Sequence, residues 1–213
     1  MISKIPYKEK IETKICLSFL LTVLIIISIL SSVMYFRSYN MLVNNVGKKA
    51  SKIAQVATEK INIEKFKDLK TVEDMNNPYF NEMGKELNYI RVISGAKYLY
   101  AMRKNEAGQY IQIIESADYN SEDPAEIGTV EDPYPGFEDV MQGKTYIDNK
   151  ISVDHYGILL SAYYPLKDSN NNVVGFVGID YNVEDEYNEF HKFRINILII
   201  SIIIWIYIFK KNF

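Results

Sequence analysis

The chain has 213 residues, of which 48% are hydrophobic and 24% charged, and its formal net charge at pH 7 is −3. Residues 1–14 and 195–213 each carry a net charge of +2, which leaves −7 for residues 15–194. Such an acidic segment argues against nucleic acid and against anionic lipid as its partner, because both repel negative charge. The single cysteine, Cys16, excludes an intrachain disulfide, so the core alone must stabilise any domain here.

Residues 15–36 form an uncharged run of 22 residues, which as a helix extends about 33 Å. The hydrocarbon core of a bilayer is about 30 Å thick. A cleaved secretory signal is the alternative, because four lysines precede the run. The apolar region of such a signal is shorter than this run, and it is followed by a small-residue cleavage site, which is absent here. We therefore predict a transmembrane helix in contact with membrane lipid over residues 15–36.

A second apolar run of 15 residues covers residues 195–209 and extends about 22 Å as a helix. It can span a slightly thinned bilayer if Arg194, Lys210 and Lys211 reach the headgroups. A buried core helix is the alternative, but this run is apolar all round. Lysines before the first span and after the second predict that residues 1–14 and 210–213 are cytoplasmic, with one extracellular domain over residues 37–194.

The first span is expected to continue as a helix into the outer domain. Apolar residues recur at steps of three and four from Leu42 to Ile61. A second helix is predicted from Pro78 to about Ser94, with proline in its first turn and Gly95 at its end.

The rest of the domain alternates between apolar and polar residues as strands do. An acidic loop is expected over residues 118–135 and a short helix over residues 136–142. The predicted fold is α+β, with the long N-terminal helix packed on an antiparallel five-stranded sheet and two flanking transmembrane helices. The five strands are residues 97–103, 109–116, 145–149, 157–166 and 173–181.

Both predicted hairpins have one aliphatic face and one aromatic and polar face. The aliphatic faces suit a packed helix, and the other faces suit a ligand pocket with a few polar groups. A face covered by loops, with tyrosines chosen for strand propensity, is the alternative. The aromatic and polar face is predicted to carry Tyr98, Tyr100, Met102, Tyr110, Gln112 and Ile114 from the first hairpin, and Ser161, Tyr163, Phe176, Gly178 and Asp180 from the second if Leu166 pairs with Val173.

Short motifs in this domain carry a resemblance to a known family. They are Tyr98-Leu-Tyr-Ala-Met-Arg103, Ile127-Gly-Thr, Ser161-Ala-Tyr-Tyr-Pro165 and Val174-Gly-Phe-Val-Gly-Ile-Asp180. With the helix that leaves the membrane, they resemble the extracytoplasmic Cache domain, a PAS-like sensor fold of bacterial chemoreceptors, sensor kinases and diguanylate cyclases. The resemblance covers residues 37–194 and both spans. It implies a small-molecule sensor that forms a homodimer along the helix of residues 42–61.

In amino-acid-binding members of that family, a Tyr-x-Asp pair and the Asp that ends the last strand hold the ligand's amino group, and an Arg-x-Trp pair holds its carboxylate. Tyr146, Asp148 and Asp180 resemble the first part, but residues 132–137 contain neither Arg nor Trp. A cation or a hydroxylated compound is therefore expected rather than an amino acid. The predicted ligand-binding residues are Tyr98, Tyr100, Tyr110, Tyr146, Asp148, Ser161, Tyr163 and Asp180.

Some of these residues have structural alternatives. Asp180 could instead help to start the helix that follows Asn182, which is a good N-cap. Arg103 is expected to be a surface residue, because it lies near a turn at the end of the aliphatic face.

No catalytic residue, metal site or cofactor is predicted. His155 and His191 are the only histidines, and no nucleophile elbow or phosphate loop is present. Residues 118–123 faintly suggest a calcium loop but lack its turn glycine. An envelope hydrolase with Asp148 and Asp180 as paired carboxylates is the least favoured reading.

The expected function is a bacterial sensor of signal transduction or chemotaxis that relays ligand binding through its two transmembrane helices. The sequence ends four residues after the second span, so no output domain is expected. The chain would then signal through a separate membrane protein or be a truncated receptor. A cell-surface binding or scaffolding module that sends no signal is the alternative.

Overall fold

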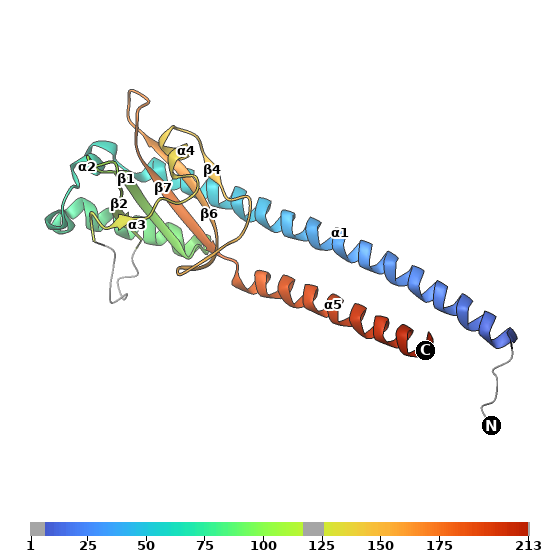
Figure 1. Ribbon diagram of the computed structural model, residues 1–213. Coiled ribbons are helices and arrows are strands. Elements are labelled where there is room, and N and C mark those ends of the chain that lie inside the picture. Colours follow the sequence, from blue (N-terminus) through green and yellow to red (C-terminus); the bar gives the residue numbers. More distant parts are fainter. Residues whose placement is uncertain (1–6, 117–125, 213) are drawn as a thin grey trace. The chain divides into compact units, whose positions relative to one another are not determined.

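The computed structural model describes residues 7–116 and 126–212 (Figure 1). The chain divides into two compact units, one within Met1–Met41 and Asp185–Phe213 and the other within Leu42–Glu184. Residues 118–123, the faint calcium-loop candidate, lie outside the described residues.

Two long helices form the first unit. The helix α1 (Tyr7–Lys60) begins here and continues without a break into the second unit, which confirms the predicted extension of the first span. The helix α5 (Glu184–Asn212) is the second helix of this unit. The two helices are in contact through aromatic rings, since the centroid of Phe190 lies 5.6 Å from that of Tyr35 and 6.2 Å from that of Tyr39.

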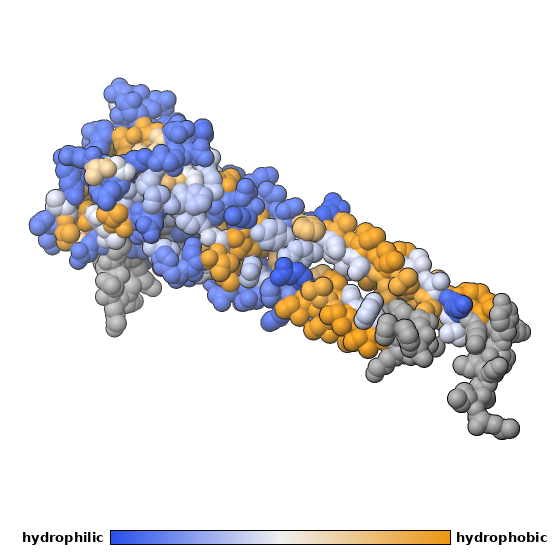
Figure 2. All heavy atoms as spheres, viewed as in Figure 1, coloured by the Kyte–Doolittle hydropathy of each residue, from blue (hydrophilic) through white to orange (hydrophobic). Residues whose placement is uncertain are grey.

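Apolar side chains cover the surface of these helices. Phe19, Ile29 and Phe36 are each more than half exposed, and Figure 2 shows the hydrophobic residues gathered along both helices. Within the described residues, one helix is long and apolar enough to cross a membrane, in Ile11–Lys60, and it contains the first predicted span. Residues 195–209 are helical within α5, but its described part does not meet the same requirement. A second crossing therefore stays a prediction.

The second unit is built on an antiparallel sheet with the order β3-β2-β1-β7-β6-β4, in which β5 also pairs with β6. The five predicted strands correspond to β1, β2, β4, β6 and β7. The sequence missed β3 and β5, because two or three residues are too few to show an alternation. The strands are β1 (Tyr98–Lys104), β2 (Tyr110–Glu115), β3 (Val130–Glu131), β4 (Tyr146–Ile147), β5 (Ser152–Asp154), β6 (Gly157–Lys167) and β7 (Val173–Asn182).

Helices α1 and α3 (Pro78–Ser94) pack on the aliphatic face of the sheet. Ala50, Ala54 and Ala57 of α1 are fully buried, and their small side chains let the helix lie close to the strands. The short helices α2 (Ile63–Asp68) and η1 (Val72–Asn76) connect α1 to α3. The predicted helix-covered face is therefore confirmed.

The helix α3 has the predicted bounds because its ends are marked in the sequence. The Asn77 side chain accepts a hydrogen bond of 2.9 Å from the Tyr79 backbone N–H, and Pro78 needs no partner at the first position. At the other end Gly95 adopts a left-handed conformation with φ of 73°, which glycine adopts without strain.

The β6–β7 hairpin differs from the predicted register by two residues. Leu166 pairs with Gly175 rather than with Val173, because the pairing is irregular next to Lys167. Side chains alternate with a period of two, so a shift of two leaves every residue on its predicted face. Ser161 and Asp180 accordingly lie opposite each other.

The face predicted for Ile114 is wrong. A bulge in the β1–β2 pair between Ala101 and Met102 places Ile114 opposite Ala101, on the aliphatic face, where it is fully buried. An extra residue in one strand reverses the alternation beyond it.

Arg103, predicted to be a surface residue, is only partly exposed. Its guanidinium donates hydrogen bonds to the backbone oxygens of Lys67 at 3.1 Å and Leu69 at 2.6 Å, and it lies over the ring of Phe66. These carbonyls end α2, and a cation stabilises a helix at that end.

We predict that Gly175→Ala lowers the unfolding temperature of the full chain. A Cβ at Gly175 would collide with the backbone oxygen of Met102 on the neighbouring strand β1. A backbone atom of a central strand cannot move aside cheaply, so the expected loss is about 1–3 kcal/mol. Differential scanning fluorimetry in detergent measures the change.

Gly84→Ala in α3 is the matched control. Its Cβ would lie 3.7 Å from the backbone oxygen of Glu115, an ordinary contact. Alanine favours a helix over glycine by about 0.5–1 kcal/mol, so this variant should be neutral or stabilised. Equal destabilisation by both substitutions would contradict the assigned strand contact.

Candidate functional site

The buried carboxylate of Asp180 is the main polar feature of the aromatic face. Asp180 lies in β7 between Ser161 on β6 and Tyr98 on β1, and all three share one face of the sheet. The residue is 6% exposed, and its Oδ1 atom has no hydrogen-bond partner among the described residues. Burial raises the pKa of Asp180 to about 7, although the hydroxyls of Ser161 and Tyr100 lower it in part.

Asp148, directly after β4, is a second buried carboxylate on this face. Its Oδ2 accepts a hydrogen bond of 2.9 Å from the Ser161 backbone N–H, and its own N–H donates to the Ser161 oxygen at 2.9 Å. Burial raises the pKa of Asp148, while the hydrogen bonds from Ser161 and Tyr146 lower it. Each carboxylate raises the pKa of the tyrosines beside it.

Aromatic rings surround these two carboxylates. Tyr146 is stacked on Tyr163 with 5.6 Å between ring centroids and 12° between ring planes. Tyr100 lies against Gly178, where any side chain would collide with its ring. Burial raises the pKa of Tyr146 to about 12 and raises those of Tyr100 and Tyr163 well above the ordinary value. Their hydroxyls therefore stay protonated and can donate hydrogen bonds at neutral pH.

Two predicted residues lie at the margins of this group. Tyr98 is half-buried, with its ring centroid 6.3 Å from that of Tyr156. Tyr110 packs instead on Phe137 of α4 (Phe137–Met141) and donates a hydrogen bond of 2.7 Å to Glu138. The structure therefore brings together Tyr98, Tyr100, Tyr146, Asp148, Ser161, Tyr163 and Asp180. Tyr110 lies in the aromatic cluster beneath α4, which also contains Tyr163, but it is bonded to Glu138 rather than to either buried carboxylate.

A cavity of about 170 Å³ opens beside Asp148. Tyr134 and Tyr146 supply aromatic walls, and Lys150 and Ser152 supply polar groups that sequence reasoning missed. Tyr134 and Lys150 lie in irregular segments, and Ser152 lies in a strand of three residues, so none of them shows a periodicity that could mark it. Tyr134 lies in the 132–137 stretch, which the sequence had marked only for lacking Arg and Trp.

No family model matches the sequence, and no curated protein matches it. Among solved structures, the sensor domain of DcuS from E. coli superposes with a TM-score of 0.50 and 12% identity, over 72% of this chain and 97% of that one. The chain has the fold of a Cache sensor domain.

Two other structures show weaker similarity to this Cache fold. The ligand-binding domain of the Campylobacter jejuni chemoreceptor Tlp3, solved with L-valine, has a TM-score of 0.48 and 13% identity over 79% of this chain. The chain spans 65% of that domain. The sensor domain of the histidine kinase DctB from V. cholerae has a TM-score of 0.41 and 16% identity, over 68% of this chain and 58% of that one.

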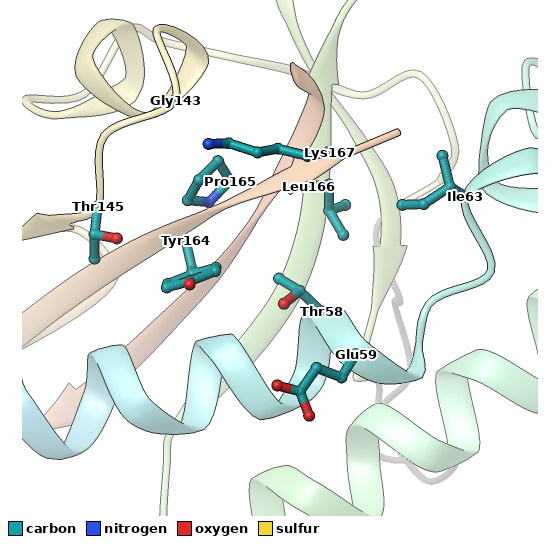
Figure 3. Close-up of a pocket in the computed structure, with 9 residues that line it drawn as sticks. All are labelled: Thr58, Glu59, Ile63, Gly143, Thr145, Tyr164, Pro165, Leu166 and Lys167. Atoms are coloured by element: carbon teal, nitrogen blue, oxygen red, sulfur yellow. The ribbon is translucent and has the colours of Figure 1, made fainter. Parts of the chain in front are cut away.

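A larger cavity in the Cache fold, of about 300 Å³, contains none of the predicted ligand-binding residues. It lies at the edge of β6 beside the end of α1, with Tyr164, Thr58 and Thr145 around it (Figure 3). Pro165 and Lys167, which also line it, are residues that keep an exposed strand edge from pairing with another chain. Within residues 7–116 and 126–212, no three His, Cys, Asp or Glu side chains gather as metal ligands would.

The raised pKa of Asp180 predicts how stability depends on pH. Its ordinary value is 3.8 and its folded value is about 7, so between these the folded chain holds one proton more than the unfolded chain. The contribution of Asp180 to stability is fully present below pH 4 and is lost as pH rises to 7, by up to about 1.4 kcal/mol per pH unit.

Asp180→Asn should remove this dependence and make the chain more stable than wild type at pH 8. Thermal unfolding measured between pH 4.5 and 8.5 tests the expectation. Asp132→Asn, at an exposed position, is the control and should keep the wild-type pH profile. An unchanged profile in Asp180→Asn would show that Asp180 is already ionised in the fold.

Proposed function

We propose that this chain is a membrane-bound extracellular sensor whose ligand binds on the aromatic face of the Cache fold. The observation that carries the proposal is the buried carboxylate of Asp180 with an oxygen that lacks a partner among the described residues. A buried carboxylate oxygen without a partner is costly, and a ligand that supplies a partner for it relieves that cost. The fold shared with the sensor domain of DcuS supports the same function.

The ligand class proposed is a small cation or a hydroxylated compound. Asp148 and Asp180 both accept hydrogen bonds, and the protonated hydroxyls of Tyr100, Tyr146 and Tyr163 donate them. A cation would be held by charge-assisted hydrogen bonds and by the faces of the aromatic rings. The cavity of about 170 Å³ is smaller than most ligand pockets and is lined by Tyr146 and Asp148 but not by Asp180, so a ligand that reaches the Asp180 carboxylate must enlarge it on binding.

The proposed topology has two membrane spans, at residues 15–36 and 195–209, and two cytoplasmic ends. Asp180 precedes the start of α5 by four residues, and the Asn182 side chain accepts a hydrogen bond of 3.0 Å from the Glu184 N–H at that start. A ligand that binds Asp180 therefore acts close to the first turn of α5. We further propose a homodimer along residues 42–61 and a separate membrane protein that receives the signal.

Binding to the full chain in nanodiscs tests the proposed site. Amines, polyamines, sugars and organic acids are screened by thermal shift, and the affinity of each stabilising compound is measured by isothermal titration calorimetry. Loss of a hydrogen bond to a charged group costs about 1.5–3 kcal/mol, so Asp180→Ala should weaken binding by about 10–100-fold.

Asp132→Ala, which removes an exposed carboxylate, is the matched control and should bind like wild type. A ligand whose affinity survives both Asp180→Ala and Tyr146→Ala would bind elsewhere. The absence of any stabilising compound from these four classes would count against the proposed ligand chemistry.

Binding of a cation should also depend on pH. Because burial raises the pKa of Asp180 to about 7, a cation must displace a proton below that pH. The dissociation constant should therefore fall by up to about tenfold per pH unit as pH rises to 7, and then level off. Calorimetry between pH 5.5 and 8.5 gives this profile, and an affinity that weakens with rising pH would contradict the role of Asp180.

A further inference from the structure

The strand β4 lies between two glycines. Its Tyr146 ring packs on Gly136, the residue before α4, and a Cβ at Gly136 would collide with that ring. The next side chain, Ile147, points to the opposite face of the strand and packs on Gly47 of α1, where a Cβ would collide with its Cγ2 atom. Successive side chains of a strand point to opposite faces, so this two-residue strand contacts a different glycine on each side.

Gly47 lies in the buried stripe of α1, between Val43 and Ala50. A glycine inside a helix costs about 0.5–1 kcal/mol relative to alanine, and one useful effect is a closer approach of another chain segment. Here that segment is β4, since the Asp148 backbone oxygen lies 3.9 Å from the position of a Cβ at Gly47.

The strand β4 is short and peripheral, so its position depends on these contacts. It pairs with β6 at Tyr163 and Ala162, and the Asp148 N–H to Ser161 bond continues that pairing. Ile147 is 37% exposed, so no larger core encloses it. A side chain at Gly47 would therefore push Ile147 away and displace β4. Tyr146 and Asp148, which flank Ile147 and face the ligand site, would move with it.

We propose that Gly47 is a positioning residue for the ligand site. By lacking a side chain, it lets α1 hold Ile147, and through the backbone of β4 it sets the place of Tyr146 and Asp148. The contact between Gly47 and Ile147 therefore couples ligand binding beside Asp148 to the position of α1 at Gly47. The inference rests on the proposed function only for what the site binds, because the contact itself exists without ligand.

The test uses the full chain in nanodiscs with 3-fluorotyrosine placed at position 146, and fluorine NMR as the readout of the ring's surroundings. Gly47→Ala should move the Tyr146 resonance by more than its linewidth, because the added methyl pushes Ile147 and with it β4. Combining it with Ile147→Ala, which removes the opposing side chain, should return the resonance to near its wild-type position. Gly84→Ala, a helix glycine that does not touch β4, should leave the resonance unchanged.

A resonance that Gly47→Ala does not move would overturn the proposal, and so would a shift that Ile147→Ala fails to reverse. If Gly47→Ala does not fold, Ile147→Ala alone decides: it leaves a gap at Gly47, which the added methyl fills in the double variant, so alone it should also move the resonance. The readout needs no ligand, so a failed binding screen would overturn the proposed function and leave this result standing.

Discussion

A buried carboxylate must replace the water it loses, either with hydrogen bonds or with a positive charge. Asp180 has only part of that replacement, since the Ser161 and Tyr100 hydroxyls lie beside it and its Oδ1 atom has no partner in the described part of the chain. At neutral pH the group is close to the midpoint between its protonated and ionised forms. A cation beside this group would favour its ionised form, so binding would shift the balance between the two charge states.

The two faces of the sheet explain why this carboxylate lies where it does. The aliphatic face is covered by the long helices α1 and α3, and the larger cavity on that side is lined by neither buried carboxylate. The other face is covered by α4, a helix of five residues, and by irregular segments. Glu138 of α4 accepts hydrogen bonds from Lys104 of β1 and Tyr110 of β2, and these bonds hold α4 on the sheet. The cavity beside Asp148 is lined by Tyr134 and Pro135, which precede this short helix, and by Tyr146 and Ser152 of the short strands β4 and β5.

Sequence patterns predicted the features that depend on local chemistry. The bounds of α3 follow from Asn77, Pro78 and Gly95, and the shared face of Ser161 and Asp180 survived a two-residue error in register because strands alternate with a period of two. The long helix α1 was also predictable, because its apolar residues recur at helical spacing over many turns.

Features that depend on distant contacts were not predictable in this way. The bulge opposite Ala101 and Met102 changed the face of Ile114, and no residue type in β2, which holds the extra residue Ile113, marks it. Arg103 binds carbonyls of α2, a helix too short to show a period. Tyr134 and Lys150 reach the cavity from irregular segments, and the role of Gly47 depends on a strand about 100 residues later in the chain.

The most direct measurement is the ionisation of Asp180 itself, observed by NMR of a chain carrying ¹³C-labelled aspartate in nanodiscs, with the Asp180→Asn variant used to assign its carboxyl resonance. The free chain at pH 6 should show this group largely protonated, and a saturating amine that stabilises the chain should shift it to the ionised position at the same pH. A resonance that is already ionised at pH 6, or that does not change when the amine binds, would contradict a ligand site built on this carboxylate.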